Sequence, residues 1–407
     1  MQHKKIVQFA VGVLMSLDMG IVAAQNMVSA GVVKIGVLTD MSGLYSDIAG
    51  QGSVVAVKMA VEDFGGKVPG HPIQVVSADH QNKADVAAGK AREWLDTQQV
   101  DMITDLVNSS TALSVIEIGR QKNRMVIVNG AASTKLTNEN CSPISINYTY
   151  DTYALAKGTA KAITAQGGNS WFFITADYAF GHSLEKDASA VVTANGGKIL
   201  GASRHPLNAS DFSSFLMQAQ ASKAKVIGLA NGSGDNVNSI KAANEFGLAR
   251  SGTQQLAALL AFITDIHSLK LNVAQGLLLT ESFYWDLDED TRKWSKRFFD
   301  KTKRMPTMIQ AGNYSSTMHY LKAVQAAGTD DTAAVMARMK ATPVNDFFAH
   351  NGKIREDGLM VHDYYLFQVK KPSESKYPWD YYQLKSVIPA AAATQPLSAS
   401  TCPLVKK

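Results

Sequence analysis

Small hydroxylated residues follow two neighbouring predicted strands. Asn108-Ser-Ser-Thr111 comes after the predicted strand 102–107. Gly130-Ala-Ala-Ser133 comes after the predicted strand 125–129. Ligands of open parallel sheets bind outside the carboxyl ends of strands, where free N–H groups and the helix dipole favour an anion such as a carboxylate. Each serine could instead only cap a helix, so two interpretations stay open: a carboxylate site or a pair of helix caps.

Aromatic residues occupy other predicted strand-to-helix turns. Tyr45 lies in the first such turn, Tyr178 and Phe180 lie in a later one, and Trp285 follows a predicted strand at 276–280. Aromatic side chains in turns commonly form the walls of a ligand cleft. These residues are therefore predicted to line a cleft together with the hydroxylated turns.

Catalytic motifs are missing from the sequence. It has no G-x-S-x-G, H-E-x-x-H, C-x-x-C, Walker A or G-x-G-x-x-G pattern. The turn Gly232-Ser-Gly234 precedes a predicted helix, and such a turn either holds an anion or simply connects a strand to a helix. Nine histidines are scattered, and two cysteines without a histidine cluster make a poor metal site. We predict a protein that is not an enzyme and needs no cofactor or metal.

Length and charge favour a two-lobed protein with an ordinary solvated surface. The chain has 407 residues, of which 46% are hydrophobic and 18% are charged, which is large for one compact domain. Forty Lys and Arg face 35 Asp and Glu, giving a formal net charge of +5. The two signs are interspersed, so we predict no nucleic-acid partner and no insertion into a membrane.

Residues 1–24 have the pattern of a signal peptide. His3, Lys4 and Lys5 are followed by an apolar run at 6–17, and small residues end the segment, which predicts cleavage before Gln25. The apolar run is too short to span a bilayer. No cysteine follows the cleavage site, so no lipid anchor is expected. The mature protein is predicted to be exported.

Cys141 and Cys402 are the chain's two cysteines, and both lie in the exported part. In an oxidising compartment an even pair favours a disulfide over two free thiols. The bond would join the end of the chain to a loop about 260 positions earlier. The Ala-, Ser-, Thr- and Pro-rich tail from Pro389 is predicted to be loosely ordered until Cys402 fixes it.

Short apolar runs alternate with amphipathic helical stretches in two series. The first series spans 34–129 and the second spans 171–280. Such alternation indicates βαβ units and parallel sheets with helices on both faces. The fold class is therefore α/β, with two doubly wound lobes. Later predicted helices and strands are interpreted as additions to these lobes, at 291–303, 311–327, 331–341, 353–355 and 364–370.

Taken in order, these segments resemble a known family over about residues 32–370. The chain resembles the periplasmic leucine/isoleucine/valine-binding proteins, the type I solute-binding proteins of ABC importers. The carrying segments are Lys34-Ile-Gly-Val-Leu-Thr-Asp-Met-Ser-Gly43, Asn108-Ser-Ser-Thr111, Gly130-Ala-Ala-Ser133, Tyr178-Ala-Phe-Gly181 and Gln275-Gly-Leu-Leu-Leu-Thr280.

The resemblance implies an architecture and partners. Two lobes would be joined by three crossovers and close on a ligand by a hinge. The N-terminal lobe would hold 31–147 and 283–362, the C-terminal lobe 148–282 and 363–388, and 389–407 would form the tail. A periplasmic monomer would deliver a small-molecule ligand to an ABC permease in the inner membrane.

It also implies roles for individual residues. Ser109, Ser110, Ala131 and Ser133 correspond to the family's carboxylate-binding set, and Phe180 to an aromatic that packs on the ligand. The complete predicted site is Tyr45, Ser109, Ser110, Ala131, Ser133, Tyr178, Phe180, Gly232, Leu259 and Trp285.

Two departures from the family pattern change the expected ligand. Leu259 stands where amino-acid binders place a carboxylate against the ligand's ammonium, and Gly232 stands where the family tends to have Tyr. Because a buried ammonium without a counter-ion is costly, we expect an aromatic or other hydrophobic carboxylate.

Three other interpretations are weighed against this one. The first is an amino-acid, amide or urea binder of the same family. The second is a secreted α/β hydrolase with Ser233 as nucleophile, which lacks the elbow pattern. The third is the sensor part of a receptor, which needs a membrane or signalling segment that this sequence does not show.

Overall fold

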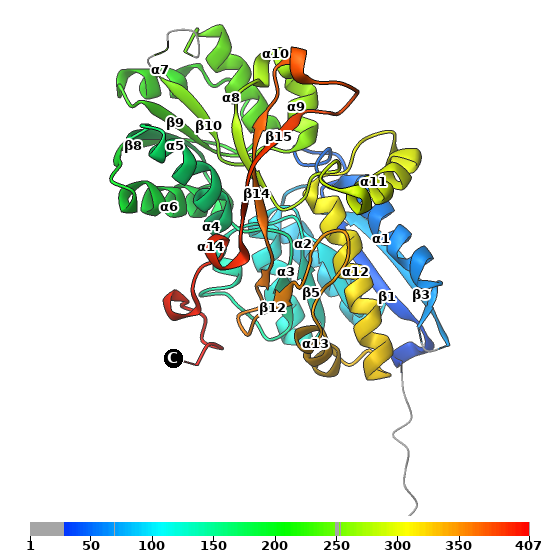
Figure 1. Cartoon of the computed structure of the whole chain (residues 1–407). Coiled ribbons are helices and arrows are strands. Elements are labelled where there is room, and N and C mark those ends of the chain that lie inside the picture. The colour runs from blue at the N-terminus through cyan, green and yellow to red at the C-terminus, as the bar shows by residue number, and fades with distance from the viewer. Residues whose placement is uncertain (1–27, 69, 249–251, 253, 407) are drawn as a thin grey trace, which may run out of the picture.

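The computed structural model describes residues 28–406 except 69, 249–251 and 253. The predicted signal peptide at 1–24 lies outside the described residues. Two lobes, each built on a parallel sheet, lie one above the other, and a third sheet runs beside their junction (Figure 1). None of the helices in the described part of the chain is long and apolar enough to cross a membrane.

The first lobe is built on a six-stranded sheet in the order β2-β3-β1-β4-β5-β6. Its neighbouring strands are parallel except for the β2–β3 pair. The strands are β1 (Val33–Thr39), β2 (Lys67–Val68), β3 (His71–Asp79), β4 (Met102–Asp105), β5 (Met125–Val128) and β6 (Ser145–Asn147).

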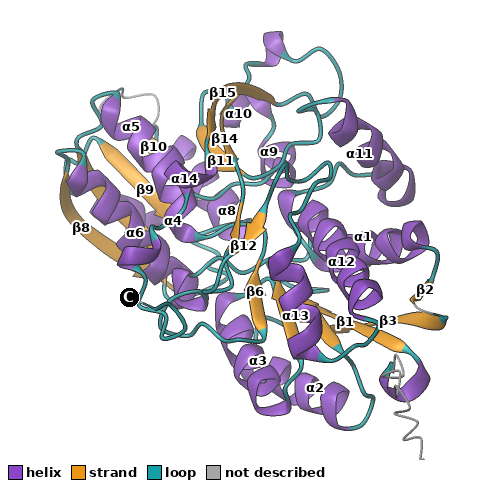
Figure 2. Cartoon of the chain, turned by 60° about the horizontal axis from the view of Figure 1, so that its bottom comes forward, coloured by secondary structure: helices purple, strands orange, loops and turns teal. Residues whose placement is uncertain are grey.

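Helices cover both faces of this sheet, as its alternating side chains require. On one face Ile103 and Val126 pack with Trp94 of the helix α2 and Val115 of the helix α3. On the other face the strands pack against helices α1 and α12. Figure 2 shows the two helix layers on either side of the strands. The helices of this lobe are α1 (Gly50–Phe64), α2 (Ala84–Asp96), α3 (Ser109–Lys122), α11 (Glu289–Thr302), α12 (Met308–Ala327) and α13 (Thr332–Ala341).

The second lobe has a parallel sheet in the order β10-β9-β7-β8. Its strands are β7 (Ser170–Ala176), β8 (Lys198–His205), β9 (Val226–Ala230) and β10 (Gln255–Ala258). A helical run that the sequence reading missed leads into it. The helices are α4 (Thr152–Leu155), the π-helical turn η3 (Ala156–Ala160), α5 (Lys161–Ala165), α6 (Ala179–Ala194), α7 (Ser213–Ala221), α8 (Gly234–Glu245), α9 (Ile263–Leu269) and α10 (Leu271–Ala274).

The third sheet is antiparallel and corrects one expectation. The strand predicted at 276–280 was expected to extend the parallel series of the second lobe. Instead β11 (Leu278–Glu281) pairs antiparallel with β14 (Tyr364–Val369), which also pairs with β15 (Tyr382–Ile388). The direction was not predictable because the partner strand comes almost ninety positions later in the chain.

The chain passes between the lobes after β6, after β11 and before β14, and two of these segments contact each other. The Asn147 N–H donates to the carbonyl of Gly358 at 2.9 Å. His362 Nε2 lies 3.1 Å from the carbonyl oxygen of Thr149. The short strands β12 (Lys353–Ile354) and β13 (Met360–Val361) precede the last passage. The exact lobe boundaries stay a prediction.

The C-terminal tail is ordered, contrary to the sequence expectation. It forms α14 (Ala390–Ala393) and the 3₁₀ turn η5 (Leu397–Ala399), and Ala393 is buried. The predicted disulfide between Cys141 and Cys402 is present, with the two Cα atoms 5.7 Å apart. The composition of the tail did not predict this order, because the side chains that bind the tail, Asn138, Cys141 and Arg355, lie earlier in the chain. The remaining 3₁₀ turns are η1 (Ser29–Gly31), η2 (Thr134–Leu136) and η4 (Pro372–Glu374).

Candidate ligand-binding site

A narrow cavity lies between the lobes, at the carboxyl ends of strands from both sheets. Its free volume is about 10 Å³, no more than one water needs. The lobes therefore have to separate for any organic molecule to enter. The cavity is lined by Tyr45, Ile48, Val107, Ser109, Gly130, Ala132, Tyr150, Tyr178, Phe180, Gly232, Leu260 and Phe262.

The turn between β4 and α3 supplies the polar part of the first-lobe wall. Asn108, rather than a serine, caps α3: its Oδ1 accepts from the N–H groups of Ser110 at 2.9 Å and Thr111 at 3.2 Å. The Ser109 hydroxyl therefore does not cap the helix. Its hydroxyl oxygen accepts from the Ser133 N–H at 3.2 Å, which links the two hydroxylated turns.

Close backbone packing fixes the second turn of this wall. A Cβ on Gly130 would lie 2.5 Å from the Cα of Val107, so only glycine allows the two strand ends to approach. The Tyr150 hydroxyl donates to the Gly130 carbonyl at 2.7 Å. The two turns singled out in the sequence therefore form one rigid surface.

The second-lobe wall is aromatic. Tyr178 and Phe180, at the start of α6, have ring centroids 6.0 Å apart. Phe262, which follows β10, meets Tyr150 edge-to-face with centroids 6.2 Å apart. Gly232 follows β9, and a Cβ there would lie 3.2 Å from Leu260. The wall combines these rings with one position that has no side chain.

Direct hydrogen bonds hold the two lobes together around the cavity. The hydroxyls of Tyr45 and Tyr178 lie 2.6 Å apart. Those of Ser133 and Ser183 are also 2.6 Å apart. Burial, followed by the neighbouring Tyr178, raises the pKa of Tyr45 well above its ordinary value, so the phenol stays neutral. These two contacts between the lobes join neutral hydroxyl groups.

Ionisable side chains lie behind the cavity wall rather than in it. None of the lining residues is a Lys, Arg, His, Asp or Glu. Burial raises the pKa of Asp105 to about 6, and this side chain accepts from Asn313 Nδ2 at 2.9 Å. Burial raises the pKa of Asp265 to about 7, although its Oδ2 accepts from the Phe262 N–H at 3.0 Å. Asp265 thus positions the lining residue Phe262 through a buried hydrogen bond, whereas Asp105 holds Asn313 behind the wall.

Comparison with known proteins decides the family. A family model described as "Periplasmic binding protein" matches residues 32–376. The chain belongs to the periplasmic binding protein family. It is accordingly a solute-binding protein of ABC transport and not an enzyme, as the sequence predicted.

Individual relatives support the same conclusion. A periplasmic binding protein from Burkholderia mallei is 57% identical, with a TM-score of 0.91, over 93% of this chain and 100% of that one. A structure from Burkholderia xenovorans, described as a branched chain amino acid ABC transporter periplasmic ligand-binding protein, is 42% identical with a TM-score of 0.82, over 92% and 100% of the two chains. Leu/Ile/Val-binding protein homolog 6 of Brucella suis is 25% identical over 362 residues, covering 86% of this chain and 90% of that protein. The predicted type I fold is confirmed.

In this periplasmic binding protein the cavity brings together half of the predicted site. Five predicted residues line the cavity: Tyr45, Ser109, Tyr178, Phe180 and Gly232. They come from turns on both lobes that are up to about 190 positions apart in the sequence. Whether they bind the ligand stays a prediction.

The other predicted residues lie nearby but do not line the cavity. Ser110 gives its N–H to the helix cap. Ala131 packs into the core formed with α2 and α3. Ser133 shares the cross-lobe bond, Leu259 is fully buried, and Trp285 Nε1 donates to the Trp379 carbonyl at 2.9 Å. Their role in ligand binding also stays a prediction.

Sequence reasoning missed several lining residues for identifiable reasons. Ala132 and Leu260 line the cavity and each lie one position after a predicted residue, Ala131 and Leu259 respectively. Tyr150 lies on a crossover that no motif marks. The remaining missed residues are Ile48, Val107, Gly130 and Phe262, which carry only an apolar or glycine signal.

Proposed function

We propose that this periplasmic binding protein captures an aromatic or other hydrophobic carboxylate between its lobes and delivers it to an ABC permease in the inner membrane. The observation that supports the ligand class is the composition of the cavity wall. A hydroxyl at a helix start faces aromatic rings, and the lining residues include no charged side chain.

The first-lobe wall suits a carboxylate. Ser109 is the first residue of α3, a helix of 14 residues, and the first N–H groups of a helix lack intrahelical partners. The Asn108 side chain already accepts from the N–H groups of Ser110 and Thr111, so the attraction for an anion comes from the positive end of the helix dipole beside Ser109. The Ser109 hydroxyl can donate to the same oxygen while it accepts from Ser133.

The second-lobe wall suits an apolar or aromatic body. Phe180, Leu260 and Phe262 offer carbon surface, and Gly232 leaves space beside them. An ammonium group placed against this wall would meet no carboxylate among the lining residues. Burying such a charge without a partner costs several kcal/mol or more. This argues against an α-amino acid.

Distant structures show that the fold has been seen with aromatic acids. A solute-binding protein from Rhodopseudomonas palustris in complex with benzoate is 19% identical with a TM-score of 0.78. Another from the same organism, in complex with 4-hydroxybenzoate, is 20% identical with a TM-score of 0.78. At such identities the likeness concerns the fold alone, so the ligand argument depends on the cavity wall.

The competing ligand is a branched-chain amino acid. The description of the Burkholderia xenovorans relative at 42% identity favours it. Such a ligand would need a counter-ion for its ammonium, and the buried Asp265 behind Phe262 is the candidate. Asp265→Asn would then abolish binding, whereas a carboxylate without an ammonium would bind this variant normally.

A thermal-shift screen tests the proposal. The protein is unfolded, dialysed and refolded to remove bound ligand, then heated with benzoate, 4-hydroxybenzoate, phenylpropenoate, leucine, valine, glutamate or urea. An acid present at 100 times its Kd should stabilise the protein by about 2.7 kcal/mol. We expect stabilisation by one or more of the aromatic acids. Stabilisation by leucine or valine and by none of the aromatic acids would overturn the proposal.

A further inference from the structure

The tail leaves the third sheet on the side of the second lobe. After β15 it forms α14, which packs against α4 and η3. These two segments in turn pack against α6, whose Leu184 and Val191 lie in the same buried cluster as Leu155. The first part of the tail is therefore attached to the second lobe.

The end of the tail is attached to the first lobe. Cys402 is bonded to Cys141, which follows η2. Leu136, before Cys141, and Ile144, after it, belong to the core that α2 and α3 share with the first sheet. The disulfide therefore ends in the body of the first lobe.

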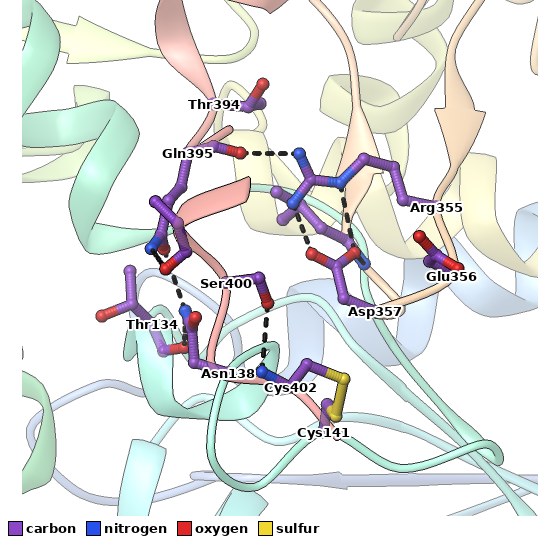
Figure 3. A network of polar contacts seen from close by, with 12 residues as sticks. Thr134, Asn138, Cys141, Arg355, Glu356, Asp357, Thr394, Gln395, Ser400 and Cys402 are labelled. Atoms are coloured by element: carbon purple, nitrogen blue, oxygen red, sulfur yellow. Dashed lines mark hydrogen bonds and ion pairs between the residues drawn. A yellow bond between two sulfur atoms is a disulfide. The ribbon is translucent and has the colours of Figure 1, made fainter. Parts of the chain in front are cut away.

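Hydrogen bonds hold the tail between these two attachments (Figure 3). Asn138 uses both ends of its amide: Nδ2 donates to Gln395 Oε1 at 3.0 Å, and Oδ1 accepts from the Thr401 N–H at 3.0 Å. Arg355, which forms an ion pair with Asp357, donates to the Gln395 carbonyl at 2.7 Å. Arg355 lies in the segment that leads to the last crossover. The middle of the tail is thus tied to the first lobe and to the hinge.

This part of the tail lies next to a contact between the lobes. In the loop of η2, Thr134 donates to Asp187 of α6 at 3.1 Å. A cavity of about 670 Å³ opens beside that contact, and its walls come from η2, from α6 and from the tail residues Gln395, Ala399 and Thr401. The tail therefore borders the side of the cleft where η2 meets α6.

We propose that residues 394–402, closed by the Cys141–Cys402 disulfide, are a covalent strap that limits how far the lobes separate. The strap adds a fourth chain connection to the three crossovers. It can lengthen only by unfolding η5 and breaking the bonds of Asn138 and Gln395, after which each residue spans at most about 3.3–3.6 Å. A closed loop of this kind removes open conformations and so shifts the population toward the closed lobes.

Two variants distinguish a strap between the lobes from a disulfide that stabilises only the first lobe. Cys141→Ser/Cys402→Ser opens the loop. Insertion of six residues of alternating Gly and Ser between Ser398 and Ala399, which are both exposed, keeps the disulfide but lengthens the strap. The readout is amide hydrogen exchange in the ligand-free protein, followed in peptides that contain Tyr45, Ser133 and Ser183. Peptides from β1 and β7 report on global stability.

The strap predicts that both variants exchange at least about fivefold faster than the native protein in the cross-lobe peptides, with β1 and β7 unchanged. Native exchange in the insertion variant would overturn the strap, even if the serine variant exchanges faster, because the disulfide would then act only within the first lobe. If the serine variant does not fold, the insertion variant alone decides. No ligand is used, so the outcome is independent of the proposed ligand class.

Discussion

The two walls of the cleft differ in the size and chemistry of the side chains that line them. The first lobe presents small residues, Ser109, Gly130 and Ala132, on turns that pack backbone against backbone. The second lobe presents the rings of Tyr178, Phe180 and Phe262. Short turns at the ends of strands give a rigid polar surface, whereas large rings cover area with little side-chain entropy to lose. Under the proposed function, the first lobe would fix the charged end of the ligand and the second would cover its body.

The largest expected effect concerns the buried carboxyl behind the aromatic wall. Burial raises the pKa of Asp265 to about 7, so the folded protein holds this proton more tightly than the unfolded chain does. Its contribution to stability is present below about pH 4 and is lost as the pH rises toward 7, by up to about 1.4 kcal/mol per pH unit.

Asp265→Asn tests this, because Asn keeps an acceptor for the Phe262 N–H. The variant should gain stability relative to the native protein as the pH rises from about 4 to about 8. Urea unfolding at several pH values measures the difference. A constant difference across this range would mean that Asp265 does not titrate there.

The next effect tests the rigidity of the aromatic wall. A Cβ on Gly181 would lie 2.0 Å from the carbonyl oxygen of Ala176, which is backbone and cannot give way easily. Gly181→Ala should therefore lower the free energy of unfolding by about 3 kcal/mol. Gly232→Ala is the matched control in the same lobe, since the nearest atom to its Cβ would be a Leu260 methyl group at 3.2 Å and no backbone atom comes close. Equal losses in urea unfolding would contradict the difference between the two turns.

Ser109→Ala tests the polar wall. If the hydroxyl donates to a ligand carboxylate, affinity should fall by about 1.5–3 kcal/mol, roughly 10- to 150-fold. Ser114→Ala is the control, because this serine lies on the same helix but outside the cavity wall, with its hydroxyl donating to the Ala84 carbonyl. Calorimetric titration with the acid that stabilises most in the screen measures both variants. An equal loss in both would remove Ser109 from its proposed role.

The smallest effect concerns the contact between the walls. Tyr45→Phe removes one of two hydroxyls that lie 2.6 Å apart, at an expected cost of about 0.5–1.5 kcal/mol to the closed arrangement. Small-angle scattering of the ligand-free protein should show a larger average radius of gyration. Tyr153→Phe, at a half-buried residue of α4 that does not line the narrow cavity, should leave it unchanged.

Periodicity predicted most of the elements of both parallel sheets because their strands and helices alternate in sequence order. What could not be predicted depends on contacts between distant segments. β11 takes its direction from β14, and the tail is ordered by Asn138 and Arg355. The same limit applies to the site. Turn chemistry located Ser109 and Phe180, but a one-residue difference in register decided that Leu260, and not Leu259, lines the cavity.

The position of Trp285 has a consequence for the fluorescence of the protein. It lies on the second passage between the lobes, and its indole N–H is bonded to the carbonyl of Trp379. Trp94, Trp171 and Trp294 are buried within the lobes, where rigid-body rotation leaves most of their surroundings unchanged; Trp294 packs against Phe298, Tyr314 and Phe347. Hinge motion should therefore alter the emission spectrum chiefly through Trp285 and Trp379, giving the unlabelled protein an intrinsic fluorescent reporter of lobe movement in real time.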